Sequence, residues 1–303
     1  MRVFLCAAVV SLFLLPSLGL AQAFLPGKGN GSVSVDIGTT HAAGHFLDDG
    51  SRLPGYSSRA NHVTLSVEYG LTDRLAVGVD IPYVRSKYTG KEEPLNLPVN
   101  VIDDGAYHGT VQDFHIEGRF SVFERPFVVT PFFALSVPSH SYETIGESAV
   151  GPNLKQYTTG VYVGRLLNPF LSQAFVHGSY SYTAVQKVLG LSLNRSNTDI
   201  AFGYFFTPRV STTFLWRTQS TYGGLGFADL YDPSTTAEVF LQSDRLTKQD
   251  FQHIGVGTGL NLTESMSANF SFIKFVSGHN AHFGEAFSGG LSWSFSTSPR
   301  LFN

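Results

Sequence analysis

The sequence predicts an all-β fold, a single antiparallel transmembrane β-barrel of about 12 strands. Three features indicate this fold: apolar residues alternate with small or polar ones, tight and long connections alternate along the chain, and aromatic residues mark the ends of the strands. The first feature is also typical of a secreted β-sandwich, whose apolar faces cover a core instead of meeting lipid. The connections and the aromatic positions therefore distinguish the two folds.

The clearest alternation lies in residues 61–84, NHVTLSVEYGLTDRLAVGVDIPYV. Two alternating runs are separated by the turn residues 70–73, and this pattern predicts a β-hairpin. One face is apolar and ends in Tyr69 and Tyr83, whereas the other carries Glu68 and Asp80 among small residues. In an outer-membrane barrel the apolar face meets lipid and the small polar face lines a lumen.

Ten further segments with the same period of two complete the predicted wall. They are residues 32–40, 112–123, 127–137, 157–167, 171–184, 197–206, 210–219, 249–262, 266–276 and 285–296. Most are near the length that a tilted strand needs to cross a bilayer. The connections alternate between short turns and long loops, the latter predicted at residues 41–60, 85–111, 139–156, 185–196, 220–248 and 277–284. With an even strand number and a long first connection, both termini are expected on the periplasmic side.

Aromatic residues gather at both ends of the predicted strands. Those at the periplasmic ends are Tyr69, Phe123, Phe127, Phe170, Phe206 and Phe295. Those at the outer ends are Tyr83, Tyr157, Tyr182 and Trp216. Two such belts are typical of a barrel in contact with membrane lipid, where aromatic rings lie at the interfaces.

The N-terminus predicts export. Residues 1–23 contain Arg2, an apolar run and the small-residue site Ala21-Gln22-Ala23, which together indicate a Sec signal peptide cleaved after Ala23. The barrel domain is then 24–303, delivered to the barrel-assembly machinery from the periplasm. The single cysteine, Cys6, lies in the signal, so no disulfide or cysteine-based metal site is expected.

Composition fits an exported membrane wall and excludes one class of partner. Charged residues make up 14% of the chain, well below the roughly 25% of a typical soluble domain. No basic run is present, so nucleic-acid binding is not expected. No cofactor-binding fingerprint is found either, and no cofactor is expected.

Residues 69–83, YGLTDRLAVGVDIPY, resemble a hairpin that recurs in a family of outer-membrane transporters linked to the meta-pathway of phenol degradation. The match is dense over this hairpin, and the rest of the chain follows the family by general pattern only. The resemblance implies a Gram-negative outer-membrane location and passive transport of small solutes, aromatic ones included. No binding residue of the family is fixed by a motif, so none is carried over.

Charged and histidine side chains on the predicted inner faces are the candidates for a functional lumen. They are Asp36, Glu68, Asp80, His115, Glu117, Arg119, His177, Arg217 and His253. Opposed acids and arginines would produce a transverse field that selects small polar or zwitterionic solutes. Equally, the same groups could form a structural ion-pair network that fills a narrow barrel. Both interpretations stay open from the sequence.

Other functions have weaker support in the sequence. His177 and Ser179 share a face at a spacing that a hydrolase would use, but no third group is fixed by spacing, so an enzyme is not expected. A structural or adhesive barrel would work through the loop at residues 220–248. Acidic pairs such as Asp48-Asp49 and Asp103-Asp104, Asp229 with Asp232, and the pair His279 and His282 fit ordinary turns better than metal sites, so no metal is predicted.

Overall fold

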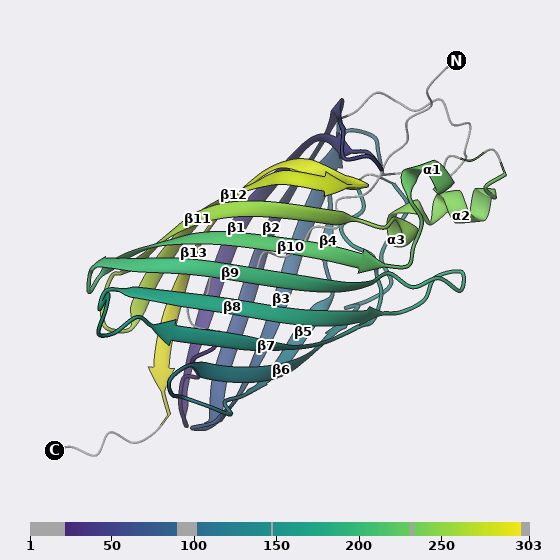
Figure 1. Ribbon diagram of the computed structural model, residues 1–303. Helices are drawn as coiled ribbons and strands as arrows, with labels where there is room; N and C mark the ends of the chain where they lie inside the picture. The colour runs from purple at the N-terminus through teal and green to yellow at the C-terminus, as the bar shows by residue number, and fades with distance from the viewer. Residues whose placement is uncertain (1–21, 90–101, 147, 231, 233, 298–303) are drawn as a thin grey trace.

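The computed structural model describes residues 22–89, 102–146, 148–230, 232 and 234–297, and these form an all-β, closed antiparallel barrel (Figure 1). The predicted signal peptide lies outside the described residues except for Gln22 and Ala23. The barrel closes because the first strand, β1 (Asn30–Phe46), pairs with the last, β13 (Ala281–Ser296), from Asn30↔Ser296 to Phe46↔Ala281. No edge strand is left between them, as a sheet surrounded by lipid requires.

The remaining strands follow one another around the wall in chain order. They are β2 (Arg52–Thr72), β3 (Leu75–Tyr88), β4 (His108–Val111), β5 (Phe114–Phe120), β6 (Val128–Val137), β7 (Gln156–Leu166), β8 (Ala174–Val185), β9 (Asn194–Thr207), β10 (Val210–Tyr222), β11 (Asp250–Asn261) and β12 (Met266–His279). Both β4 and β5 pair with β3, and only Gln112 and Asp113 separate them. Together they occupy the place of one interrupted strand, so the barrel wall has the predicted 12 strands.

The outer surface of the wall is apolar, as the alternation predicts. Apolar side chains such as Ile37, Phe214 and Leu291 are 59%, 59% and 53% exposed. A soluble protein would bury so large an apolar surface in its core. The aromatic residues at the strand ends are exposed too, among them Phe123, Phe170 and Phe206 at one end and Tyr83 and Tyr157 at the other. Two apolar faces pressed together, as in a sandwich, are therefore ruled out for this sheet, and its apolar side is a surface for membrane lipid.

The strands continue beyond the predicted ends on the loop side, which corrects three expected loops. Residues 41–60, 85–111 and 277–284 were expected as connections, but β1 reaches Phe46, β2 begins at Arg52, β3 reaches Tyr88, and Asn280 alone joins β12 to β13. The alternation of apolar and polar side chains ends where the strand leaves the lipid. The backbone hydrogen bonds between strands continue beyond that point, where the side chains are polar. The pattern therefore marks the lipid-facing part of each strand and not its end.

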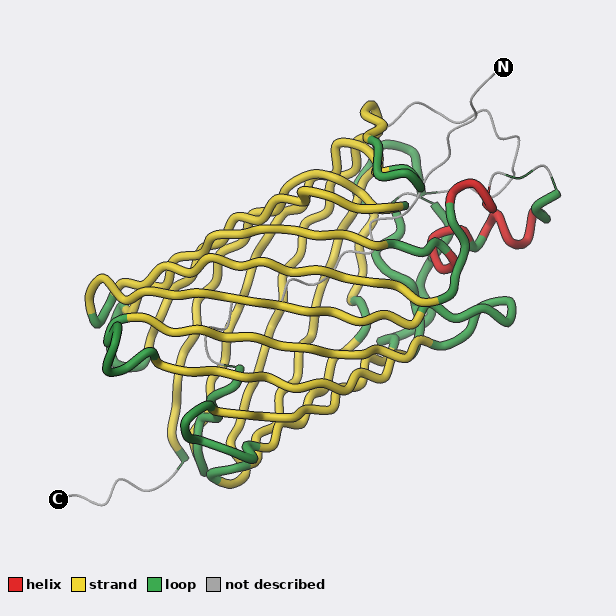
Figure 2. The backbone as a smooth tube through the Cα atoms, in the orientation of Figure 1, coloured by secondary structure: helices red, strands yellow, loops and turns green. Residues whose placement is uncertain are grey.

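The two ends of the barrel differ, as Figure 2 shows in green and red. One end has tight turns such as Asp73-Arg74 and Pro208-Arg209. The other carries the longer loops and three short helices, α1 (Phe227–Leu230), α2 (Ala237–Leu241) and α3 (Ser243–Leu246), within the loop predicted at 220–248. None of the helices in the described residues is long and apolar enough to cross a membrane.

The α1 helix is attached to the barrel rim by backbone donors. The Phe227 N–H donates to Asn280 Oδ1 at 2.9 Å, and the Ala228 N–H donates to Asp48 Oδ2 at 2.9 Å. The Phe227 side chain is buried and its ring lies 5.7 Å, edge to face, from that of His45. The helical loop therefore covers part of the outer mouth of the barrel, and the segment 223–249 is called the cap below.

Candidate functional site

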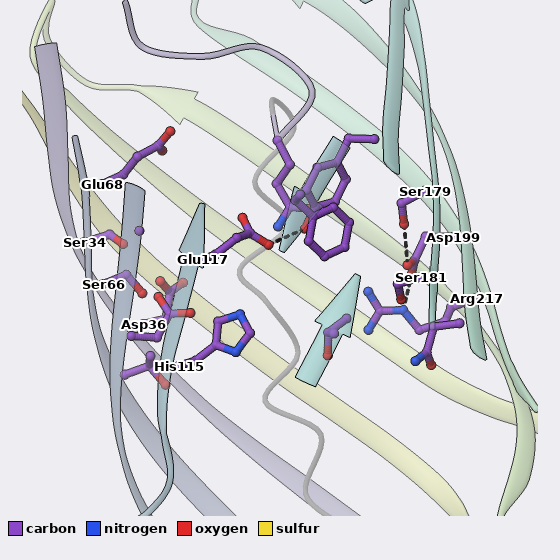
Figure 3. Close-up of a pocket in the computed structure, with 18 of the residues that line it drawn as sticks. Ser34, Asp36, Ser66, Glu68, His115, Glu117, Ser179, Ser181, Asp199 and Arg217 are labelled. Atoms are coloured by element: carbon purple, nitrogen blue, oxygen red, sulfur yellow. Dashed lines mark hydrogen bonds and ion pairs between the residues drawn. The ribbon is translucent and has the colours of Figure 1, made fainter. Parts of the chain in front are cut away.

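The interior of the barrel contains a cavity of about 950 Å³, lined by polar side chains from nearly every strand (Figure 3). These side chains reach it because alternate residues of a strand point to opposite faces, and the outward set is apolar. Seven of the nine predicted lumen residues line the cavity: Asp36, Glu68, Asp80, His115, Glu117, Arg119 and Arg217. His177 is half-buried and His253 is fully buried, and both lie outside this lining set.

One wall of the lumen, formed by β1, β2, β3 and β5, is acidic. Asp36, Glu68, Asp80 and Glu117 come from these four strands and are accompanied by one guanidinium, that of Arg119. The register places Asp80 opposite His115 and Arg119 opposite Ala76. Figure 3 shows Glu68, Asp36, Glu117 and His115 along this wall, together with Ser34 and Ser66.

Arg119 is the centre of an ion-pair network in the part of the acidic wall nearest the tight turns. Its guanidinium forms an ion pair with Glu68, and its Nε lies 3.2 Å from Glu117 Oε1. Its Nη1 also donates to the carbonyl oxygen of Gln22 at 2.9 Å, and the Tyr162 hydroxyl donates to Glu117 Oε2 at 2.9 Å. Arg119 itself is only 5% exposed, so this is a mostly buried network with the carboxylates as its acceptors.

The N-terminal residues of the described chain enter the lumen beside this network, which the sequence did not indicate. Ala23 is fully buried against Phe132, Ala134 and Tyr162, and its carbonyl accepts a hydrogen bond of 2.6 Å from the Thr130 hydroxyl. Gln22 and Phe24 line the same cavity. The residues around the predicted cleavage site therefore narrow the lumen near the tight-turn end.

The opposite wall, on β8, β9 and β10, carries a compensated charge pair. The Arg217 guanidinium is hydrogen-bonded to Asp199, and the Ser179 hydroxyl donates to Asp199 Oδ2 at 2.8 Å. Figure 3 shows these three side chains directed toward one another. Asp199 was not among the predicted functional residues. The hydrogen bonds show that it is the centre of this cluster.

The arrangement of His177 and Ser179 does not match that of a hydrolase. Ser179 donates to a carboxylate rather than to an imidazole, and the His177 ring lies 5.8 Å from that of Tyr162. A nucleophilic serine needs a hydrogen-bonded base, with a third group orienting that base. In the described residues the serine and the histidine share a face without forming this contact.

His253 belongs to a packed part of the interior and not to the open lumen. It is 1% exposed, and its ring contacts those of Phe251 and Phe275 at 5.9 and 5.3 Å. Nearby strands contribute an apolar cluster inside the barrel, made of Ala201, Leu215, Ile273 and Ala286. Part of the interior is thus filled with side chains, and the cavity occupies another part of it.

The outer mouth contains two further arginines that the sequence did not single out. Arg195 on β9 is hydrogen-bonded to Gln156, and Arg245 on α3 donates to Gln242 Oε1 at 3.0 Å. Burial lowers the pKa of Arg195 to about 10, so it remains charged at neutral pH. Together with Asp244 these side chains line the cavity where the cap meets the barrel.

The acidic loop residues act as turn-forming groups. Asp49 accepts from the Ser51 N–H, Asp104 from the Ala106 N–H and Asp232 from the Ser234 N–H, each at 2.8 Å. Such bonds from a side chain to the backbone two residues ahead are Asx turns. Within the described ranges, no group of three or more His, Cys, Asp or Glu is arranged to hold a metal ion.

The barrel architecture is similar to that of several solved structures. No protein-family model matches the chain, and no curated protein matches it in sequence. Among solved structures, an outer membrane channel from Pseudomonas putida F1 is similar with a TM-score of 0.70 and 11% identity, covering 90% of this chain and 98% of that one. The NanC porin gives a TM-score of 0.52 and 11% identity over 86% of this chain and 98% of its own.

A Bordetella autotransporter β-domain is also similar, with a TM-score of 0.51 and 9% identity, covering 88% of this chain and all of that one. At such low identity these likenesses concern the fold, and membership of the phenol meta-pathway family stays a prediction. The chain has the fold of Gram-negative outer-membrane β-barrel channels and porins.

Proposed function

We propose that the protein is a passive outer-membrane channel for small solutes. The observation that supports this most directly is the cavity of about 950 Å³, polar in its lining and enclosed by a wall whose outer face is apolar. A barrel with a fully packed interior would need no such space, and a soluble protein would not expose that outer face. The similarity in fold to outer-membrane channels supports the same function.

The finer solute class is small molecules, aromatic ones included. Support comes from the hairpin at residues 69–83 and from the rings of Phe132, Tyr162 and Phe175, which line the same cavity as the charged residues. Phe132 and Tyr162 are stacked, with ring centroids 4.3 Å apart. An aromatic solute could contact such rings while its polar group faces the charged walls.

The path of the chain to the membrane belongs to the same proposal. Export by Sec, cleavage after Ala23 and insertion by the barrel-assembly machinery follow from the signal at residues 1–23. If cleavage occurs there, Arg119 loses the Gln22 carbonyl and Thr130 loses that of Ala23. The mature lumen would then be wider at this point than in the full chain.

Planar-bilayer conductance and liposome swelling test the proposal. Purified protein that shifts on an unheated gel, and is therefore folded, should produce discrete conductance steps and admit small sugars and amino acids into liposomes. Folded protein that leaves the bilayer electrically silent and admits no small solute would refute the channel. A hydrolytic barrel would instead release products from lipid or peptide substrates in a manner that Ser179→Ala abolishes.

A further inference from the structure

The charges on the acidic wall are not balanced. Arg119 pairs with Glu68 and Glu117, and on the opposite wall Arg217 pairs with Asp199. For Asp36 and Asp80, the structure shows no ion pair with any described residue. These two carboxylates lie near the middle of their strands, whereas Glu68, Glu117 and Asp199 each have an arginine partner.

The carboxylate of Asp36 lacks a hydrogen-bond donor on one of its oxygens. Its Oδ1 accepts a long bond of 3.4 Å from Asn269 Nδ2, whereas its Oδ2 is buried and has no partner among the described residues. The whole residue is only 6% exposed although it lines the cavity. A buried acceptor without a donor is costly, so a native structure normally supplies one.

The wall is shaped to hold this carboxylate in place. Asp36 pairs in register with Gly290, where an added Cβ would lie 2.2 Å from Asp36 Oδ1 and 2.7 Å from its Cγ. Only glycine leaves space for the side chain to lie against β13. The position of the carboxylate is therefore fixed by the backbone of the neighbouring strand.

Asp80 and two serines complete the cluster. Ser66 is opposite Asp80 on β3 and opposite Ser34 on β1, so both hydroxyls lie in the row next to Asp36. Asp36 and Asp80 therefore lie in adjacent rows of the same inner face. Figure 3 shows Ser34, Ser66 and Asp36 side by side, with His115 beside them. The two carboxylates thus share a cluster with hydroxyl groups and an imidazole, and no ion pair with a described residue neutralises either of them.

We infer that Asp36 and Asp80 form a binding subsite for the ammonium group of small amine-bearing solutes that pass through the lumen. This inference rests on the proposed channel function and names a substrate class for it. An ammonium group offers three N–H donors and a positive charge, so it can satisfy both carboxylates and a serine hydroxyl at once. A divalent metal fits poorly, because no group of three or more metal-ligating His, Cys, Asp or Glu side chains occurs in the described part of the chain.

The rest of the lumen suits the carbon part of such a solute. The stacked rings of Phe132 and Tyr162 line the same cavity. On the opposite wall, the Arg217–Asp199 pair is compensated, so it neither attracts nor repels a cation strongly. An organic cation therefore finds its charge partner on one wall and apolar contact elsewhere in the cavity.

Single-channel recording with benzylamine at neutral pH, where the amine is protonated, tests the subsite. Benzyl alcohol is the uncharged control of the same shape. We expect wild-type channels to prefer K⁺ over Cl⁻ in a salt gradient, and benzylammonium but not benzyl alcohol to reduce the K⁺ current. Asp36→Asn and Asp80→Asn should each weaken this block roughly tenfold, the scale of one charge-assisted hydrogen bond.

Two further variants separate the subsite from a general field. Asp244→Asn removes one negative charge from the outer mouth of the same cavity and should leave the block unchanged. Gly290→Ala keeps every charge but displaces Asp36, so it should weaken the block while the K⁺ preference persists. Mobility on unheated gels verifies that each variant is folded.

The possible outcomes distinguish the two proposals. Equal benzylammonium block in wild type and in the Asp36→Asn/Asp80→Asn double variant would overturn the subsite and leave the channel function standing. Absence of benzylammonium block in wild-type channels would do the same, because two carboxylates that share a proton would not attract a cation. If the double variant loses the K⁺ preference but keeps the benzylammonium block, the cluster acts only through its general negative field, and the subsite is also overturned. If wild-type protein shows no conductance, the proposed channel function is refuted. Calorimetric titration of the folded barrel with benzylamine then tests the subsite separately, and the absence of binding would refute the subsite too.

Discussion

Removing the Arg119 side-chain charge should destabilise the barrel because it leaves two carboxylates unpaired in the lumen. Arg119 is 5% exposed, and the side chains of Glu117 and Glu68 are 15% and 32% exposed. Breaking a buried ion pair from one side costs about 3–5 kcal/mol. Because Glu68 retains contact with solvent, we expect Arg119→Met to lower the free energy of unfolding by about 2–3 kcal/mol.

A rescue separates this electrostatic cost from lost packing. In the triple variant Arg119→Met, Glu68→Gln and Glu117→Gln, no charge is stranded, so much of the lost stability should return. Arg74→Met, which removes a guanidinium from an exposed turn, should change stability by less than about 0.5 kcal/mol. Urea unfolding of the barrel in lipid vesicles, followed by tryptophan fluorescence and gel mobility, measures each variant. A triple variant as unstable as Arg119→Met would refute the argument, as would a negligible loss in Arg119→Met itself.

Three further results are expected. Burial, with the neighbouring His282, lowers the pKa of His45 to about 2, whereas an exposed histidine has a pKa near 6.5. Protonation therefore favours the open cap, and the free energy that keeps the cap closed should fall as the pH drops below 6.5, by about 2 kcal/mol at pH 5. Hydrogen exchange of residues 225–230 at pH 7.5 and pH 5 measures this, and an unchanged protection factor would contradict it. His45→Asn should flatten the pH dependence, whereas His140→Asn, in an exposed loop, should not. Intact mass of the exported protein should correspond to a chain beginning at Phe24, and any other start would refute the cleavage site. Wild type and Ser179→Ala should both hydrolyse lipid and peptide substrates no faster than a blank, and hydrolysis by wild type that Ser179→Ala abolishes would revive the enzyme alternative.

The sequence predicted the part of the fold that touches lipid. Alternation in residues 61–84 and in ten further segments located the wall, because side chains facing hydrocarbon must be apolar. It did not locate the ends of β1, β2 and β3 on the loop side, where polar side chains continue the ladder. It also missed the α1 helix, since α1 is held by contacts to Asp48 and Asn280, which are far away in sequence.

The sequence predicted which side chains face the lumen, but it could not predict which side chains form ion pairs or hydrogen bonds with one another. Arg119 and Glu68 are 51 residues apart, and their contact depends on β5 lying beside β3 and β3 beside β2. The role of Gly290 is visible only once β13 closes on β1 and Asp36 occupies the space that a side chain would fill. A glycine in an alternating strand carries no signal of which neighbour needs that space.

The Arg217–Asp199 pair shows where such a contact could have been derived. Residues Pro208 and Arg209 form a two-residue turn with Thr207 opposite Val210, and an unbroken ladder from this turn would place Asp199 opposite Thr218. Yet alternation puts both Asp199 and Arg217 on the inner face, and cross-strand partners must share a face. The two conditions agree only if the ladder shifts by one residue. The structure has that shift between Val210 and Ser211, and it brings Arg217 opposite Asp199. A tight turn and two inward charges are thus enough to predict both the bulge and the ion pair from sequence.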